Sequence, residues 1–205
     1  MMYAKSKETV QTILDVARTL FMEKNYADVT INDIVSRSGV SKGALYHHFS
    51  SKEDLYLKMM HHYLAQIQES TQDAAERSTG PCRERLFASM LTFLQLPGEM
   101  LGVLRLVRRD INIFKVPIRA ELIRAYQTAV PEQVEAIIRA GIEAGELRPL
   151  NSRLLSWELV ALVEVVLHPY SQKTIGGPQE MAELVISIFF DGVAAHEHML
   201  QSAGT

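Results

Sequence analysis

One stretch of the chain, residues 30–52, decides the fold: TINDIVSRSGVSKGALYHHFSSK. Thr30 lies three residues before an aspartate, an N-cap arrangement in which side chains satisfy the free N–H groups of a new helix. Gly39 is the residue best suited to the left-handed conformation that ends a helix. Ser41 predicts the cap of a second helix, which is short because residues 49–51 close it. The stretch therefore predicts two helices joined by a tight turn.

The second of these helices is too short to be stable by itself, so a scaffold must hold it. Leu45 and Phe49 lie four residues apart and are expected to point inward, which leaves the other side chains outside. Two helices joined by a glycine-containing turn, the second short and exposed, are typical of a helix-turn-helix unit whose second helix enters the DNA major groove. The alternative is an ordinary helical corner of a bundle.

The outward residues of this stretch suit DNA contact. Lys42 can reach guanine or a phosphate, while Gly43 and Ala44 lack bulk and let the helix backbone approach the groove floor. Residues at helix starts and edges can contact phosphates. The predicted DNA-binding residues are Thr30, Ser41, Lys42, Gly43, Ala44, Tyr46, His47, His48 and Lys52.

The same residues carry a family resemblance. From Thr30 to Leu55 the chain reads T-x-x-D-I-x-x-x-x-G-V-S-K-G-x-L-Y-x-H-F-x-S-K-E-x-L, which resembles the N-terminal domain of TetR-family transcriptional regulators. The resemblance implies a homodimer that reads a palindromic operator in double-stranded DNA and, in most members, represses a promoter until a small ligand releases it. His47 departs from the pattern, since an aromatic such as tyrosine is frequent there, and this affects the expected operator sequence.

Helical spacing of apolar residues continues through the chain, and no alternating strand pattern of useful length occurs. We therefore expect an all-α fold of about nine helices. A helix-turn-helix DNA-binding domain is expected over residues 1–52 and a ligand-binding and dimerisation bundle over residues 53–205, with a helix over 52–76 connecting the two. The other main helices are expected over residues 7–24, 118–144 with a kink at Pro131, 152–168 and 179–200.

The last two expected helices are candidates for dimerisation, because an apolar helix needs cover on both sides. The predicted interface residues are Leu159, Val163, Val166, Leu184, Ile188 and Phe189. A core helix buried within a monomer is the alternative interpretation.

Candidate contacts to an unknown small-molecule effector are Phe93, Arg108, Phe114, Tyr126, Trp157 and Glu164. Packing in the core is the plainer explanation for the aromatic members. A charge buried in an apolar helix needs a partner. Glu164 therefore pairs with an arginine, reaches across the dimer or meets a ligand.

Composition narrows the class of protein. The net charge is −3, with +1 in residues 1–60 and −4 in the remainder, which permits a DNA-binding N-terminus. Cys82 is the single cysteine, so a reducing compartment is the natural expectation, and a redox switch between subunits is the alternative. No signal peptide or membrane span is visible in the sequence. We expect a cytoplasmic protein without membrane association.

An enzyme is not expected, because the sequence contains no nucleophile–base pairing, phosphate loop or metal-ligand set. No cofactor is indicated. The pairs His61-His62 and His196-x-His198 are expected to be surface histidines, since acidic or cysteine partners at matching spacing are lacking, and no metal site is predicted. One functional alternative remains open, a constitutive DNA-binding regulator or an activator whose C-terminal domain serves dimerisation or a protein partner.

Overall fold

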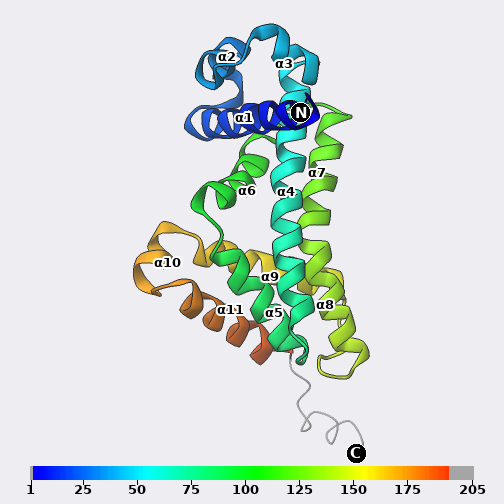
Figure 1. Cartoon of the computed structure of the whole chain (residues 1–205). Helices are drawn as coiled ribbons and strands as arrows, with labels where there is room; N and C mark the ends of the chain where they lie inside the picture. Colours follow the sequence, from blue (N-terminus) through cyan, green and yellow to red (C-terminus); the bar gives the residue numbers. More distant parts are fainter. Residues whose placement is uncertain (1, 194–205) are drawn as a thin grey trace, which may run out of the picture. The chain divides into compact units, whose positions relative to one another are not determined.

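The computed structural model describes residues 2–193, and the side chains of residues 6–191 (Figure 1). Regular structure in this part of the chain is helical, without a β-strand. The all-α expectation is therefore confirmed.

The chain folds into two compact units. The first unit comprises Met1–Gln66 and Pro97–Tyr126. It contains α1 (Met2–Glu23), the 3-10 helix η1 (Tyr26–Asp28), α2 (Ile31–Ser38), α3 (Lys42–His48), the start of α4 (Lys52–Arg77), α6 (Gly98–Asp110) and most of α7 (Ile118–Ala129).

Helix caps at the start of the first unit follow the expected chemistry. Thr30 and Asp33 form a reciprocal capping box, and Gly39 ends α2 with a positive φ of 69°. At the start of α4 the Ser51 hydroxyl accepts a hydrogen bond from the Asp54 N–H over 3.1 Å. These caps fix where α2 begins and ends and where α4 begins.

The core of the first unit comes from the apolar stripe of α1 and from inward residues of α2–α4. These side chains share near-complete burial: Ile13, Ala17, Phe21, Val29, Ile34, Leu45, Phe49, Leu55 and Met59. Burying side chains of this size stabilises the unit by about 1.5–3 kcal/mol each, before the entropy of ordering them is subtracted.

Within the described residues, the second unit comprises Ile67–Leu96 and residues 127–193. It contains the end of α4, α5 (Cys82–Leu94), α8 (Pro131–Glu143), α9 (Ser152–Val166), α10 (Pro169–Thr174) and α11 (Pro178–Val193). Helix α9 packs against α8 and α11, and α11 packs against α5. A Cβ atom at Gly141 would lie 2.7 Å from the Cys82 Sγ atom, so a glycine is required where α8 meets α5.

Two helical expectations need correction. The helix expected over residues 118–144 is two helices, because the chain breaks at Val130 (φ −124°, ψ −76°) and Pro131 starts α8. The short α10, also started by a proline, was not expected. The first compact unit also extends beyond residue 52 to include α6 and most of α7, and the functional boundary expected between residues 52 and 53 stays a prediction.

Candidate nucleic-acid interface

Helix α3 is the best candidate for DNA contact because it is short, capped and anchored on one side only. The Ser41 hydroxyl accepts a hydrogen bond from the Ala44 N–H over 3.1 Å. Leu45 and Phe49 are buried, as expected, and fix the inner face. Figure 1 shows α2 and α3 together on one side of α1, in the order of a helix-turn-helix unit.

The outer face of α3 presents the predicted contact residues. Ser41, Lys42, Gly43, Tyr46 and His47 are exposed, whereas Ala44 and His48 are half-buried. Within residues 6–191 the Lys42 side chain makes no hydrogen bond or ion pair, so its ammonium is available to a partner. Tyr46 is 47% exposed, so its ring is accessible to a partner.

Thr30 has a structural role in addition to the predicted phosphate contact. Its hydroxyl donates to an Asp33 carboxylate oxygen over 2.7 Å and accepts from the Asp33 N–H over 3.1 Å. The hydrogen bonds from the Thr30 N–H and hydroxyl lower the pKa of Asp33. Thr30 is exposed, so a phosphate can approach it, but its hydroxyl is already engaged.

Lys52 is also used within the protein. Its ammonium donates hydrogen bonds of 2.9 Å to the carbonyl oxygens of Tyr26 and Val29 and lies 4.2 Å from the centroid of the Tyr26 ring. Two of its three N–H groups therefore hold the η1 segment on α4, a role that the sequence did not indicate. One N–H group remains for the predicted phosphate contact.

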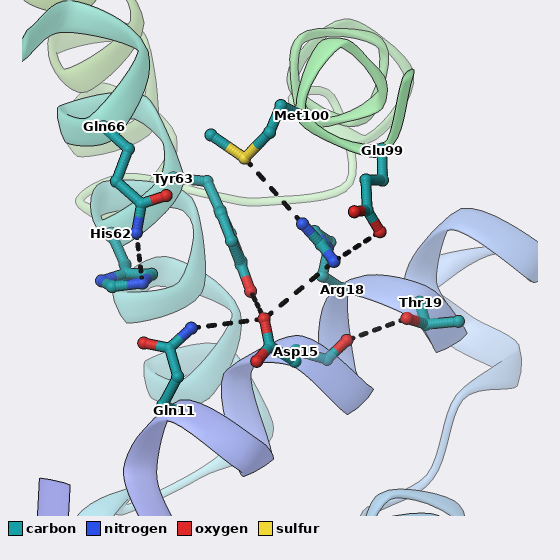
Figure 2. Close-up of polar contacts among 9 residues, drawn as sticks. All are labelled: Gln11, Asp15, Arg18, Thr19, His62, Tyr63, Gln66, Glu99 and Met100. Atoms are coloured by element: carbon teal, nitrogen blue, oxygen red, sulfur yellow. Dashed lines mark hydrogen bonds and ion pairs between the residues drawn. The ribbon is translucent and has the colours of Figure 1, made fainter. Parts of the chain in front are cut away.

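A buried arginine ties α1 to α4 and α6 inside the first unit (Figure 2). Arg18 is 8% exposed, and its Nη2 donates to a Glu99 carboxylate oxygen over 2.8 Å. Its guanidinium carbon lies 4.6 Å from the centroid of the Tyr63 ring, and the Tyr63 hydroxyl donates to Asp15. The sequence reasoning missed this cluster, although Arg18 stands between Leu14 and Phe21 on an otherwise apolar stripe.

A second polar cluster ties α6 to the end of α1. Asp110 is 1% exposed and accepts hydrogen bonds from the Tyr56 hydroxyl over 3.0 Å and from Arg109 over 2.7 Å. Arg109 also donates to the Phe21 carbonyl over 2.8 Å. Burial, followed by the Asp110 charge, raises the pKa of Tyr56. These bonds and those of Arg18 hold the C-terminal half of α1, the platform of the helix-turn-helix unit, against α4 and α6.

The six candidate effector residues are divided between the two units. Phe114 is buried in an aromatic cluster of the first unit, and the Arg108 guanidinium donates to the Tyr126 hydroxyl over 3.4 Å in that same unit. Phe93, Trp157 and Glu164 belong to the second unit, where Phe93 is buried, Glu164 is half-buried and Trp157 is exposed. Phe93 and Phe114 each pack within their own unit, and effector contact by the six residues stays a prediction.

The predicted interface residues divide by exposure. Leu159, Val166 and Phe189 are buried within their own subunit, and Val163 is half-buried. Leu184 and Ile188 are exposed one turn apart on α11. The exposed apolar side chains of α9 are instead Leu154, Trp157 and Val165.

A groove of about 530 Å³ lies between α9 and α11 in the second unit. It is lined by Arg148, Leu150, Asn151, Leu154, Leu155, Glu158, Leu162, Ile188 and Phe189. None of the six candidate effector residues lines it, whereas two of the predicted interface residues do.

Other kinds of site find little support in the described part of the chain. No group of three or more His, Cys, Asp or Glu side chains there could hold a metal ion, and His196 and His198 lie outside the described residues. His61 contacts Glu121 over 3.1 Å.

No single helix between residues 2 and 193 is long and apolar enough to cross a membrane; α5 and α6 reach that length and composition only when taken together.

Both halves of the chain match known protein families. The family described as "Bacterial regulatory proteins, tetR family" matches residues 13–59, which include α2 and α3. The family described as "Tetracyclin repressor-like, C-terminal domain" matches residues 79–193. The chain belongs to the TetR family.

Individual TetR-family relatives are distant. The chain is 26% identical over 141 residues to the HTH-type transcriptional repressor DhaR of Mycobacterium sp. (strain GP1), covering 67% of this chain and 69% of that protein. It is 28% identical over 145 residues to the HTH-type transcriptional activator FasR of Mycolicibacterium smegmatis, covering 70% of this chain and 66% of FasR. The chain thus spans about two thirds of the length of these relatives.

The TetR fold is also evident among solved structures. The transcriptional regulator FadR from Bacillus subtilis, solved in complex with stearoyl-CoA, superposes with a TM-score of 0.76 at 18% identity, covering 91% of this chain and 99% of FadR. At this identity the likeness shows the fold alone. Together with the family matches, it makes the protein a TetR-family transcriptional regulator with a helix-turn-helix DNA-binding domain.

Proposed function

We propose that the protein is a homodimeric repressor that binds a palindromic operator through α3 and is released by a small-molecule effector. The observation that carries the DNA-binding part is the outer face of α3. Lys42, Tyr46 and His47 are exposed there, while Leu45 and Phe49 anchor the opposite face. A helix held this way presents fixed side chains to base edges, which lowers the entropy lost on binding.

The proposed dimer rests on the apolar surface of the second unit. Val165 on α9 is 61% exposed and Ile188 on α11 is 52% exposed, and Leu154 lines the α9–α11 groove together with Ile188. A second copy of α9 and α11 related by a two-fold axis would cover these side chains and form a four-helix interface. The buried Leu159, Val166 and Phe189 would then support this face from within the subunit rather than contact the partner.

A dimer is also what operator recognition requires. One copy of α3 offers too few base contacts for strong specificity, and two copies reach successive major grooves when they lie about 34–36 Å apart. Members of the TetR family bind operator DNA as dimers. We therefore expect the operator to be an inverted repeat whose half-sites are separated by about one helical turn.

Effector control is the part of the proposal that depends most on the family. Related structures contain small-molecule ligands, among them FadR of Bacillus subtilis with stearoyl-CoA. Helix α4 continues without a break from the first unit into the second, so a shift of its C-terminal half is transmitted covalently toward α3. Coupling of about 1–3 kcal/mol, roughly 5–150-fold in operator affinity, is typical of such control.

An activator, or a regulator that binds constitutively, is the second candidate function. The relative FasR is a transcriptional activator, and its similarity to this chain is comparable with that of the repressor DhaR. In this case the second unit would serve dimerisation or a protein partner. A promoter fusion carrying the selected operator separates the candidates, because a repressor lowers its expression and an activator raises it.

Selection of bound duplexes from a random DNA pool tests the proposed function. We expect enrichment of an inverted repeat, and a footprint with two-fold symmetry on the selected sequence. Titration of candidate effectors into the complex should then release the DNA. A pool that yields no enriched sequence would contradict the proposed operator binding, and a complex that resists every effector supports the constitutive alternative.

A further inference from the structure

The most basic segment of the first unit lies outside the helix-turn-helix. Residues 105–124 contain six Lys or Arg residues and two acids, in a chain whose net charge is −3. Arg109 is paired with Asp110, and Glu121 with His61. Lys115 and Arg119 are exposed, and their side chains make no hydrogen bond or ion pair within residues 6–191.

Phe114 anchors this segment beside the helix-turn-helix. Its ring lies 4.7 Å from that of Tyr26, in η1, and 5.1 Å from that of Tyr56, near the start of α4. The η1 helix is followed directly by Thr30, where α2 is capped. Lys115, the next residue after Phe114, is therefore held close to the DNA-reading elements by buried aromatic packing.

Contacts along α4 place the start of α7 at the same level of this helix as the end of α3. Phe114 contacts Tyr56, and seven residues later Glu121 contacts His61, so this segment runs along α4 in the same direction. Lys58 lies between Tyr56 and His61 along α4. It donates a hydrogen bond of 3.1 Å to the carbonyl of His48, the last residue of α3. Residues 115–119 thus follow α4 at the level of the C-terminal end of α3.

The carboxylates of α4, α6 and α7 in this region already have partners. Asp54 accepts from the Lys58 ammonium over 3.0 Å, Glu121 contacts His61 over 3.1 Å, and Asp110 pairs with Arg109. Lys115 and Arg119 are exposed and have no such partner within residues 6–191. Cations of this kind attract phosphates by Coulomb interaction and release condensed counterions when DNA binds.

We propose that Lys115 and Arg119 form a phosphate-binding patch that contacts the DNA backbone beside the half-site read by α3. This inference rests on the proposed DNA binding and extends the interface from α3 to the start of α7. Phosphate contacts of this kind position the protein and raise affinity without reading sequence. DNA is favoured over an acidic protein or an anionic membrane because Phe114 fixes the patch to the unit that contains α3.

The salt dependence of DNA affinity tests the Lys115–Arg119 patch. The test variant is Lys115→Ala/Arg119→Ala in the full chain, bound to a labelled mixed-sequence duplex longer than three helical turns. The matched control is Arg139→Ala/Lys173→Ala, which removes the same charge from exposed positions in the second unit. Both pairs lack side-chain hydrogen bonds within residues 6–191, so folding is expected to be unaffected.

We expect the slope of log K against log salt to fall by about 1 for each lost contact, hence by about 2 per bound subunit, only in the test variant. Its affinity should fall at least about tenfold at low salt, equally for operator and mixed-sequence DNA, since phosphate contacts carry no sequence information. The charge-conserving variant Lys115→Arg/Arg119→Lys should keep the wild-type slope.

An unchanged slope in a test variant whose parent binds DNA would overturn the patch and leave the proposed function standing. An equal fall of the salt slope in the control variant would also contradict the patch, because it would show a general effect of net charge. Binding of the parent, but not of the test variant, to phosphatidylserine vesicles, with identical DNA slopes, would assign the patch to membranes instead. If the parent chain had no measurable affinity for any duplex, the proposed function itself would be contradicted.

Discussion

The Tyr56 hydroxyl donates a 3.0 Å hydrogen bond to the Asp110 carboxylate, which is 1% exposed. This bond joins α4 to α6, and Arg109 extends it to the Phe21 carbonyl at the end of α1. A carboxylate so deeply buried is tolerated only when it is paired and hydrogen-bonded. The cluster therefore fixes the platform on which α2 and α3 are carried.

Substitution of Asp110 should destabilise the first unit strongly. Asp110→Ala leaves the Tyr56 hydroxyl and Arg109 without their acceptor and is expected to lower the free energy of unfolding by about 3 kcal/mol. Tyr56→Phe removes one hydrogen bond and should lower it by about 1 kcal/mol. Urea denaturation of the parent chain and both variants measures these losses. Variants as stable as the parent chain would show that the cluster contributes little to stability.

The Ser41 cap should matter more for DNA binding than for overall stability. Ser41→Ala removes the acceptor for the Ala44 N–H and is expected to reduce stability by about 1 kcal/mol. Because α3 has only seven residues, its first turn should fray and operator affinity should fall. Ser41→Asp would restore the cap but add a charge that repels phosphate. Thermal unfolding should show that Ser41→Asp regains the stability of the parent chain. Fluorescence anisotropy should show that it does not regain operator affinity.

Lys52 should contribute to folding as well as to any phosphate contact. Lys52→Ala removes the hydrogen bonds to the Tyr26 and Val29 carbonyls and is expected to destabilise the protein by about 1–2 kcal/mol. Lys42→Ala, on the exposed face of α3, should leave stability unchanged. Equal denaturation midpoints for Lys52→Ala and the parent chain would contradict the structural role.

The proposed dimer face predicts a change of mass. Ile188→Glu places a charge among apolar side chains at the proposed interface and should convert the dimer to a monomer of 23.1 kDa. Ile113→Glu is the matched control, because Ile113 is 50% exposed and lies in the first unit. Light scattering after gel filtration measures both masses. A parent chain that is monomeric, or a control that dissociates equally, would contradict the proposed interface.

Cys82 should be inert in the folded protein. Burial, followed by the charge of Glu146, raises the pKa of its thiol to about 12, so the thiol stays protonated near neutral pH. A thiol reagent should label Cys82 quickly only after unfolding. Rapid labelling of the native protein would instead support the redox alternative.

Local chemistry in the sequence predicted much of the fold. Thr30, Gly39 and Ser41 marked the ends of α2 and α3, because capping and left-handed conformation depend on adjacent residues. The broken helix at Val130 was harder, since a proline can either kink a helix or start a new one. Helix α10 has six residues and lacks a periodic apolar pattern long enough to detect.

Long-range partners could not be predicted from spacing. Arg18 finds Glu99 at a separation of 81 residues, and Tyr56 finds Asp110 at a separation of 54 residues. Similarly, an apolar helix pattern does not say which face is covered by the same chain. Leu159 and Phe189, which the pattern predicts at the interface, are buried within the subunit. Exposed Val165 is the kind of residue that only the packed structure identifies.

Operator affinity of Lys42→Ala tests the central claim, that α3 is the DNA-reading helix. Measured by fluorescence anisotropy on the selected operator, with Lys173→Ala as the control, the substitution should weaken binding by about 1–3 kcal/mol per subunit, tenfold or more in the dissociation constant. It should also erase protection at the two-fold related half-sites. An unchanged affinity together with an unchanged footprint would contradict the placement of the recognition helix.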